Sequence, residues 1–117
     1  MARVNLALAR AASGAPAEAE AELRAARETA PASRYSLIDY NRARLAAQAS
    51  RDAEVVALLT PHDGAWTTHE PYLLLARSLG RMGRRGEARR ALEAAARVAP
   101  PSERPAIEGV LRSLPEN

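Results

Sequence analysis

The chain has 117 residues, with 17 basic and 14 acidic side chains and no cysteine. This length suits one folding unit and is too short for two ordinary domains, and the lack of cysteine excludes disulfides, thiolate metal sites and cysteine nucleophiles. A net charge of +3 implies only a weak attraction to acidic partners. Because alanine dominates the apolar residues and only 3% of residues are aromatic, we predict an all-α fold of closely packed helices.

The N-terminal segment has an arginine before an apolar stretch, as a signal peptide does. Asn5 and Arg10 interrupt that stretch, so we interpret the segment as the first helix of a repeat and not as a leader. The sequence contains no apolar run of about 18 residues, the length that a membrane helix needs. We therefore predict no membrane span and a cytoplasmic location.

The sequence repeats itself with a period of about 34 residues, which lies in the range of helical repeat proteins. Residues 14–31 and 83–100 have equal length, apolar residues at matching places and a closing Ala-Pro. A weaker copy begins at Ser50, so that the anchors Gly14, Ser50 and Gly83 follow one another at nearly equal intervals. Self-similarity of this kind is typical of stacked helical hairpins.

Each copy contains two helices joined by a tight turn. In the clearest copy, apolar residues at helical spacing lie on both sides of Gly83, and the second helix ends at Pro100. Thr68 and Ser102 each stand three residues before a proline, so we predict that these hydroxyls cap two helices. The last of these helices has a predicted stripe of Ile107, Val110, Leu111 and Leu114 that covers the final hairpin.

The spacing in the third copy resembles the signature of a tetratricopeptide repeat (TPR). The residues that carry the resemblance are Tyr72, Leu75, Ala76, Leu79, Gly83, Ala88, Leu92, Ala95 and Pro100. The resemblance implies a right-handed superhelical array of antiparallel helix hairpins, an α-solenoid, as one domain over residues 1–117. Its repeats would span residues 1–33, 34–66 and 67–100, with a capping helix at 102–114.

The second repeat departs from this pattern at three places. Asp39 replaces a bulky aromatic residue and Arg42 an apolar one, so we predict either a one-residue slip of the helix or exposure of both side chains. Pro61 shortens the second helix of this repeat. We predict that Trp66, in the long link that follows, fills the space left by the shortened helix.

TPR arrays, by resemblance, bind peptides or partner helices in a concave groove lined by the first helix of each repeat. The groove residues that the resemblance implies here are Asn5, Leu8, Tyr40, Asn41, Arg44, Leu73, Arg77 and Arg81, with Val4 beside them. The asparagine amides suit pairing with a peptide backbone, and the arginines favour acidic ligands. We therefore predict a non-catalytic interaction module for a protein or peptide.

No catalytic, cofactor or metal site is predicted. His62, Asp63, His69 and Glu70 cluster in sequence near Trp66. We interpret the first two as turn residues and the last two as the start of a helix, where a glutamate is favourable. The chain is therefore not expected to be an enzyme.

Three alternatives stay open. The third repeat is rich in arginine. Its outer side chains are either a solvated face or a binding site for a polyanion or nucleic acid, and the residues concerned are Arg84, Arg85, Arg89 and Arg90. The chain could instead be an accessory or dimerisation domain of a larger enzyme. A homodimer would form through the N-terminal helix, which no other predicted helix covers.

Overall fold

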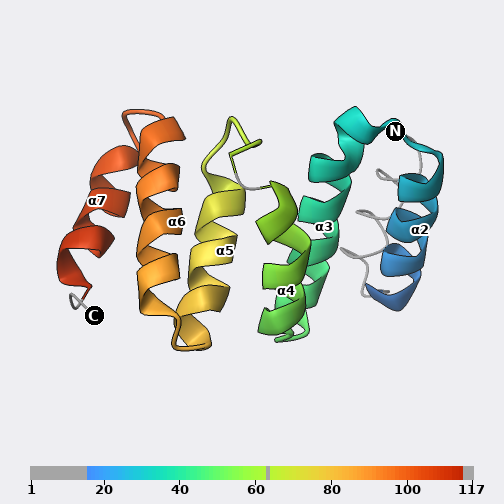
Figure 1. Cartoon of the computed structure of the whole chain (residues 1–117), viewed down its shortest axis with the longest axis horizontal. Helices are drawn as coiled ribbons and strands as arrows, with labels where there is room; N and C mark the ends of the chain where they lie inside the picture. The colour runs from blue at the N-terminus through green and yellow to red at the C-terminus, as the bar shows by residue number, and fades with distance from the viewer. Residues whose placement is uncertain (1–15, 63, 115–117) are drawn as a thin grey trace.

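The structure, a computed structural model, describes residues 16–62 and 64–114. Over these residues the chain forms six α-helices that stand in a row (Figure 1). They are α2 (Pro16–Thr29), α3 (Tyr35–Gln48), α4 (Asp52–Leu59), α5 (Glu70–Arg81), α6 (Arg85–Val98) and α7 (Arg104–Ser113). Single 3-10 turns at Ala32–Arg34 and Thr60–His62 precede α3 and follow α4. The all-α prediction is confirmed for this part of the chain.

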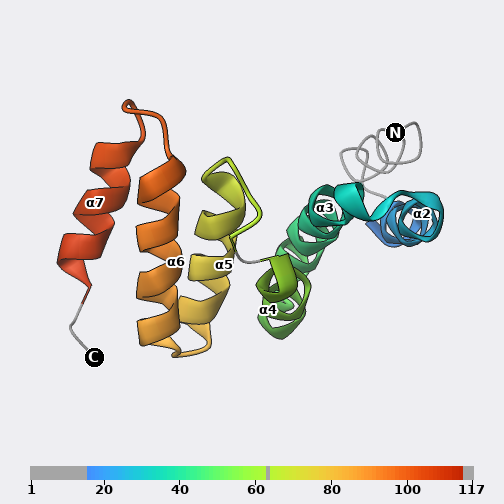
Figure 2. The same ribbon diagram turned by 45° about the horizontal axis from the view of Figure 1, so that its top comes forward.

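The helices pack mainly on their neighbours in sequence. Beyond these neighbours, α3 also contacts α5. In Figure 2, α2 is seen close to end-on and α3 obliquely, while α5, α6 and α7 are seen from the side, so the helix axes turn along the row. The radius of gyration is 14.7 Å, above the roughly 13 Å of a compact domain of this length. The molecule is therefore an elongated, sequentially packed array.

The turn between α3 and α4 and the turn between α5 and α6 have the same backbone geometry. Ser50 and Gly83 both adopt the left-handed conformation, with φ of 59° and 78°. The N–H group that follows each of them donates to a carbonyl five residues back, Arg51 to Ala46 and Arg84 to Leu79, both at 2.9 Å. This is the hydrogen bond with which a left-handed residue closes the end of a helix. The two repeat anchors Ser50 and Gly83 thus occupy equivalent places in the backbone.

Exchanging the two left-handed residues is expected to change stability in opposite directions. Ser50→Gly removes the clash between a side chain and a left-handed backbone and should raise the free energy of unfolding by about 0.5–1 kcal/mol. Gly83→Ser should lower it by about 1 kcal/mol. A Cβ on Gly83 meets no atom within 4 Å, so backbone strain alone would cause the loss. Denaturant unfolding followed by far-UV circular dichroism measures both changes, and a destabilised Ser50→Gly variant would contradict this account.

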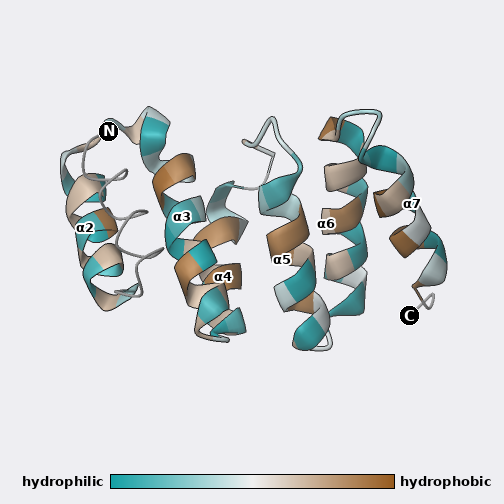
Figure 3. Ribbon diagram, turned by 180° about the vertical axis from the view of Figure 1, so that it is seen from behind, coloured by the Kyte–Doolittle hydropathy of each residue, from teal (hydrophilic) through white to brown (hydrophobic). Residues whose placement is uncertain are grey.

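Two clusters of buried side chains hold the row together. The central cluster joins residues of α3 to α7 with Trp66 and contains many alanines, for example Ala43, Ala88, Ala91 and Ala95. The α2–α3 cluster consists of Ala19, Leu23, Ala26, Ile38 and Leu45. Hydrophobic segments alternate with hydrophilic ones along the helices in Figure 3, as expected of helices with one face inward. Alanine thus supplies much of the buried surface between the helices, as the composition predicted.

The helix α3 is enclosed on two sides because it lies between the two clusters. Ile38 belongs to the α2–α3 cluster and Ala43 to the central cluster. Asp39, on the same helix, is only 4% exposed, and the side chain of Arg42 is 18% exposed. The expectation that both side chains reach solvent is therefore wrong for Asp39, whereas Arg42 is enclosed only in part.

Helix ends agree with the prolines of the sequence but not with the predicted caps. The helix α4 ends at Leu59, before Pro61, which confirms the shortened second helix. The N-caps of α5 and α7 are His69 and Glu103, without a side-chain capping hydrogen bond, in place of the predicted hydroxyls of Thr68 and Ser102. The prolines themselves occupy the first turn of each helix, as predicted, so their fixed φ angle contributes where the hydroxyls do not.

The helix α7 covers the end of the central cluster with one edge only. Ile107 is buried, and Leu111 and Leu114 pack against the cluster. Val110, predicted on the same stripe, is 48% exposed, so that part of the prediction is wrong. Arg104 donates to the carbonyls of Ala96 and Ala99 and so fastens α7 to the end of α6.

None of the helices within residues 16–62 and 64–114 has the length and apolar character that a membrane span requires.

Candidate functional site

The predicted groove residues of the described chain come from α3 and α5. These two helices run in the same direction (Figure 1) and are in contact. We call the surface formed by Leu37, Tyr40, Arg44, Leu73 and Arg77 the α3–α5 face. Tyr40 and Leu73 are partly buried against the central cluster, whereas Arg44 and Arg77 are exposed. Asn5 and Leu8, with Val4, lie outside the described residues.

Tyr40 and Arg44 form a pair on this face. The guanidinium carbon of Arg44 lies 5.9 Å from the centroid of the Tyr40 ring, within reach of a cation–π attraction. Burial raises the pKa of the Tyr40 phenol above its usual 10.0; the Arg44 charge lowers the pKa and the Glu70 charge raises it. Since the phenol stays protonated at neutral pH, it remains a hydrogen-bond donor.

The arginines on α5 differ in their surroundings. Arg81 Nη1 lies 3.5 Å from Asp52 Oδ1 on α4, and its side chain is 52% exposed. In the described part of the chain, Arg44 and Arg77 have no carboxylate within ion-pair distance. On the α3–α5 face, the positive charge offered to a ligand therefore comes from Arg44 and Arg77.

Asn41 takes a different place from the one that the resemblance implies. It is only 4% exposed, and its Nδ2 donates to the Leu37 carbonyl at 3.0 Å, one turn back in the same helix. One of its amide N–H groups is engaged inside α3 and the side chain is buried, so the chemistry of the face rests on Tyr40, Arg44 and Arg77.

A hollow of about 240 Å³ opens where α3 and α5 begin. We call it the linker hollow, because the segment between α4 and α5 forms one wall. Its lining includes Leu37, Tyr40, Trp66, Thr67, Thr68 and Pro71. Leu37 is 45% exposed, which is unusual for a leucine in this chain. The sequence prediction missed Leu37, although it stands one helical turn before Tyr40 and two before Arg44, on the same side of α3.

Trp66 fixes the wall of the linker hollow. Its ring meets those of His62 and Tyr72 edge to face, at centroid distances of 6.0 and 5.4 Å. The Gly64 N–H donates to the Tyr72 hydroxyl at 3.1 Å. Trp66 is buried in the central cluster, in agreement with the prediction that it packs inside the fold beside the short α4.

Behind Trp66 lies a buried charge cluster around Asp39. Its carboxylate accepts from Arg27 Nε of α2 at 3.0 Å and from Arg42 Nη1 at 3.3 Å, and it lies 2.7 Å from His62 Nε2. Opposite charges at positions 39 and 42 of one helix are a sequence signal for such a pair. The contacts bring together α2, α3 and the turn after α4, so we interpret the cluster as structural.

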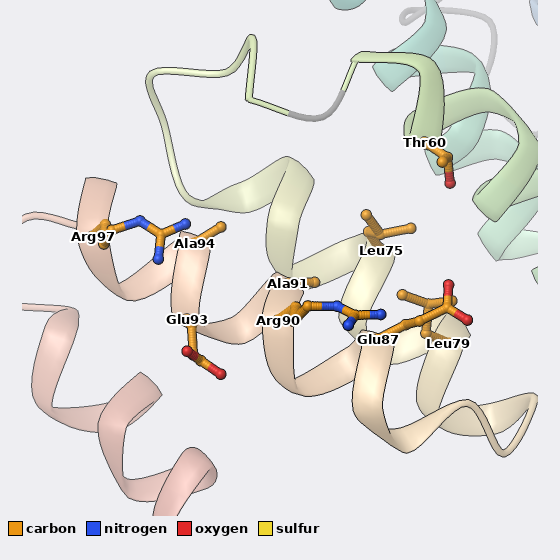
Figure 4. Close-up of a pocket in the computed structure, with 9 residues that line it drawn as sticks. All are labelled: Thr60, Leu75, Leu79, Glu87, Arg90, Ala91, Glu93, Ala94 and Arg97. Carbon is orange, nitrogen blue, oxygen red and sulfur yellow. The ribbon is translucent and has the colours of Figure 1, made fainter.

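Another hollow, of about 460 Å³, lies between the end of α4 and α6, with α5 as its floor (Figure 4). Leu75 and Leu79 form the floor and are almost fully buried. The rim alternates in charge, with Glu87, Arg90, Glu93 and Arg97 on α6. It shares no lining residue with the linker hollow, and its mixed charge selects no ligand of one sign.

The arginine-rich turn between α5 and α6 is exposed but partly engaged within the chain. Arg84 makes two hydrogen bonds to the Glu87 carboxylate, at 2.9 and 2.7 Å. Arg89 donates to the Leu114 carbonyl. Arg85 and Arg90 are exposed, and the aromatic rings that stack nucleic-acid bases are absent from residues 73–114.

The two histidines contact different carboxylates within the described residues. His62 contacts Asp39, whereas His69 Nδ1 lies 3.4 Å from Glu70. The described residues contain no group of three or more His, Cys, Asp or Glu that could hold a metal ion. Asp63 lies outside the described residues.

Comparisons of the chain with protein-family models, with curated proteins and with solved structures found no match. Over its described residues the chain is an all-helical array of sequentially packed helices.

Proposed function

We propose that this chain is a TPR-like interaction module that binds an acidic segment of a partner protein along the α3–α5 face. The observation that carries the proposal is the pair of exposed arginines, Arg44 and Arg77, that have no acidic partner in the described chain. A carboxylate of a ligand would gain charge-assisted hydrogen bonds there without displacing an internal ion pair.

Two features of the fold support the TPR-like part of the proposal. The turns after α3 and α5 repeat the same hydrogen bonds, one at Ser50 and one at Gly83, and the helix axes turn along the row. Parallel first helices side by side, here α3 and α5, would form a continuous surface along which an extended peptide can lie. In this arrangement Tyr40 adds a phenol donor beside Arg44.

The proposal can be tested with a fluorescein-labelled peptide of alternating glutamate and serine and fluorescence anisotropy. The variant Arg44→Ala/Arg77→Ala should weaken binding by about 10- to 100-fold, since each lost charge-assisted contact is worth roughly a factor of ten. The control Arg90→Ala/Arg97→Ala removes the same charge from exposed positions on α6 and should change the dissociation constant less than about twofold.

Equal losses in the two double variants would mean that the peptide senses only net charge, and would contradict the proposed site. The polyanion alternative predicts tighter binding of single-stranded oligothymidylate than of the peptide. It also predicts that Arg84→Ala/Arg85→Ala weakens that binding and reduces its salt dependence.

A further inference from the structure

We infer that the linker hollow receives one apolar side chain of the bound segment, so that the ligand is an acidic peptide with an apolar anchor. This inference rests on the proposed function and adds the sequence pattern of the ligand. The hollow lies at the start of the α3–α5 face, and Leu37 and Tyr40 belong to both.

The size and lining of the hollow suit a single side chain. Its volume of about 240 Å³ is below the roughly 300–1,000 Å³ of small-molecule sites. Leu37, Trp66 and Pro71 supply apolar walls, and the hydroxyls of Thr67 and Thr68 stand beside them. An aliphatic or aromatic side chain would remove the exposed part of Leu37 from water, which is favourable in proportion to the apolar area buried.

The wall formed by Trp66 is in place before any ligand binds. The edge-to-face contacts with His62 and Tyr72 hold the indole, and the Gly64–Tyr72 hydrogen bond holds the linker. A preformed wall lowers the entropy cost of ordering the site when a ligand binds.

The two helices set the distance between the anchor and the acidic groups. Arg44 stands four residues after Tyr40 and Arg77 six residues after Pro71, which corresponds to about 6 and 9 Å along the helix axes. An extended peptide advances about 3.3 Å per residue. The carboxylates should therefore stand about two and three residues from the anchor.

The test compares synthetic peptides of equal charge. One set carries leucine with glutamates two and three residues away, in either chain direction; the other set has serine in place of the leucine. At least one leucine peptide should bind roughly tenfold tighter than its serine counterpart, the factor expected for partial burial of a leucine side chain. It should also shift the emission of Trp66, the only tryptophan of the chain.

Two variants of exposed apolar residues complete the design. Leu37→Ala should reduce the advantage of leucine over serine to less than about threefold. Val110→Ala, a control at a residue of similar exposure on α7, should keep the full advantage.

The outcomes separate this inference from the proposed function. If serine and leucine peptides bind equally well, and both through Arg44 and Arg77, the inferred apolar anchor is wrong. The proposed binding of acidic peptides would still hold. If no acidic peptide binds, the proposed function fails. Trp66 emission that changes with protein concentration in the absence of peptide would assign the hollow to a second copy of the chain and overturn the inference.

Discussion

Replacing Asp39 with alanine is expected to lower the free energy of unfolding by about 3 kcal/mol. Removing one member of a buried ion cluster leaves the others without compensation, at a cost of roughly 3–5 kcal/mol. We expect a loss at the lower end of this range because the Arg27 side chain is 39% exposed and can reorient into the solvent. Arg42 and His62 are more enclosed, and Arg42 Nε is already buried without a hydrogen-bond partner in the described chain.

The matched control is Glu87→Ala. Glu87 also makes two hydrogen bonds with an arginine, but both side chains are 42% exposed. Exposed pairs contribute about 0–1 kcal/mol, so the control should cost less than about 1 kcal/mol. Urea unfolding followed by circular dichroism measures both variants. If both variants lose a similar free energy of unfolding, solvent screens the Asp39 cluster as fully as the exposed Arg84–Glu87 pair.

The second large effect is expected from two leucines that are completely buried. Leu59→Ala, in the central cluster, and Leu23→Ala, in the α2–α3 cluster, should each cost about 3 kcal/mol, the middle of the range for a leucine truncated in a core. The two substitutions should destabilise different helices, because each helix is stabilised mainly by contacts with its neighbours in sequence. Leu23→Ala should weaken α2 and its contact with α3, and Leu59→Ala the helices from α3 to α6.

Hydrogen exchange followed by mass spectrometry locates these effects. In Leu23→Ala, exchange should accelerate in α2 and stay close to the wild-type rate in α6 and α7. Leu59→Ala should accelerate exchange in α4 and α5. A uniform acceleration along the described chain in both variants would show that the row opens as one unit, in contradiction to near-neighbour packing.

The parts of the fold that could be predicted from the sequence are those set by local chemistry. Gly83 and Pro61 act on the backbone within a few residues of themselves, so the turn before α6 and the end of α4 were predictable. The alanine-rich helical spacing predicted which sides of α5 and α6 are buried. The burial of Trp66 was predictable because it is the one large aromatic side chain of the link that follows the short α4.

The remainder depends on contacts between elements far apart in sequence. Asp39 pairs with Arg27 and with His62, which lie 12 and 23 residues away, and no local pattern shows that these three side chains meet. The spacing of Asn41 in the sequence fits the repeat pattern of a groove residue, but the burial of its side chain depends on how α3 packs. The spacing between Leu37 and Tyr40 could have predicted that both lie on one side of α3. The hollow beside Leu37 could not be predicted, because residues 65–68 between α4 and α5 form part of its lining.

The near-neighbour packing of the row also decides in what order the molecule can be built. Since most contacts join residues close in sequence, the chain has a low contact order, and folding in microseconds to milliseconds is expected. A ribosome adds about 5–20 residues per second, so a new hairpin takes seconds to synthesise. Each hairpin therefore has time to fold and pack against the preceding one before the next is synthesised. The array can thus fold progressively from its N-terminal end during translation.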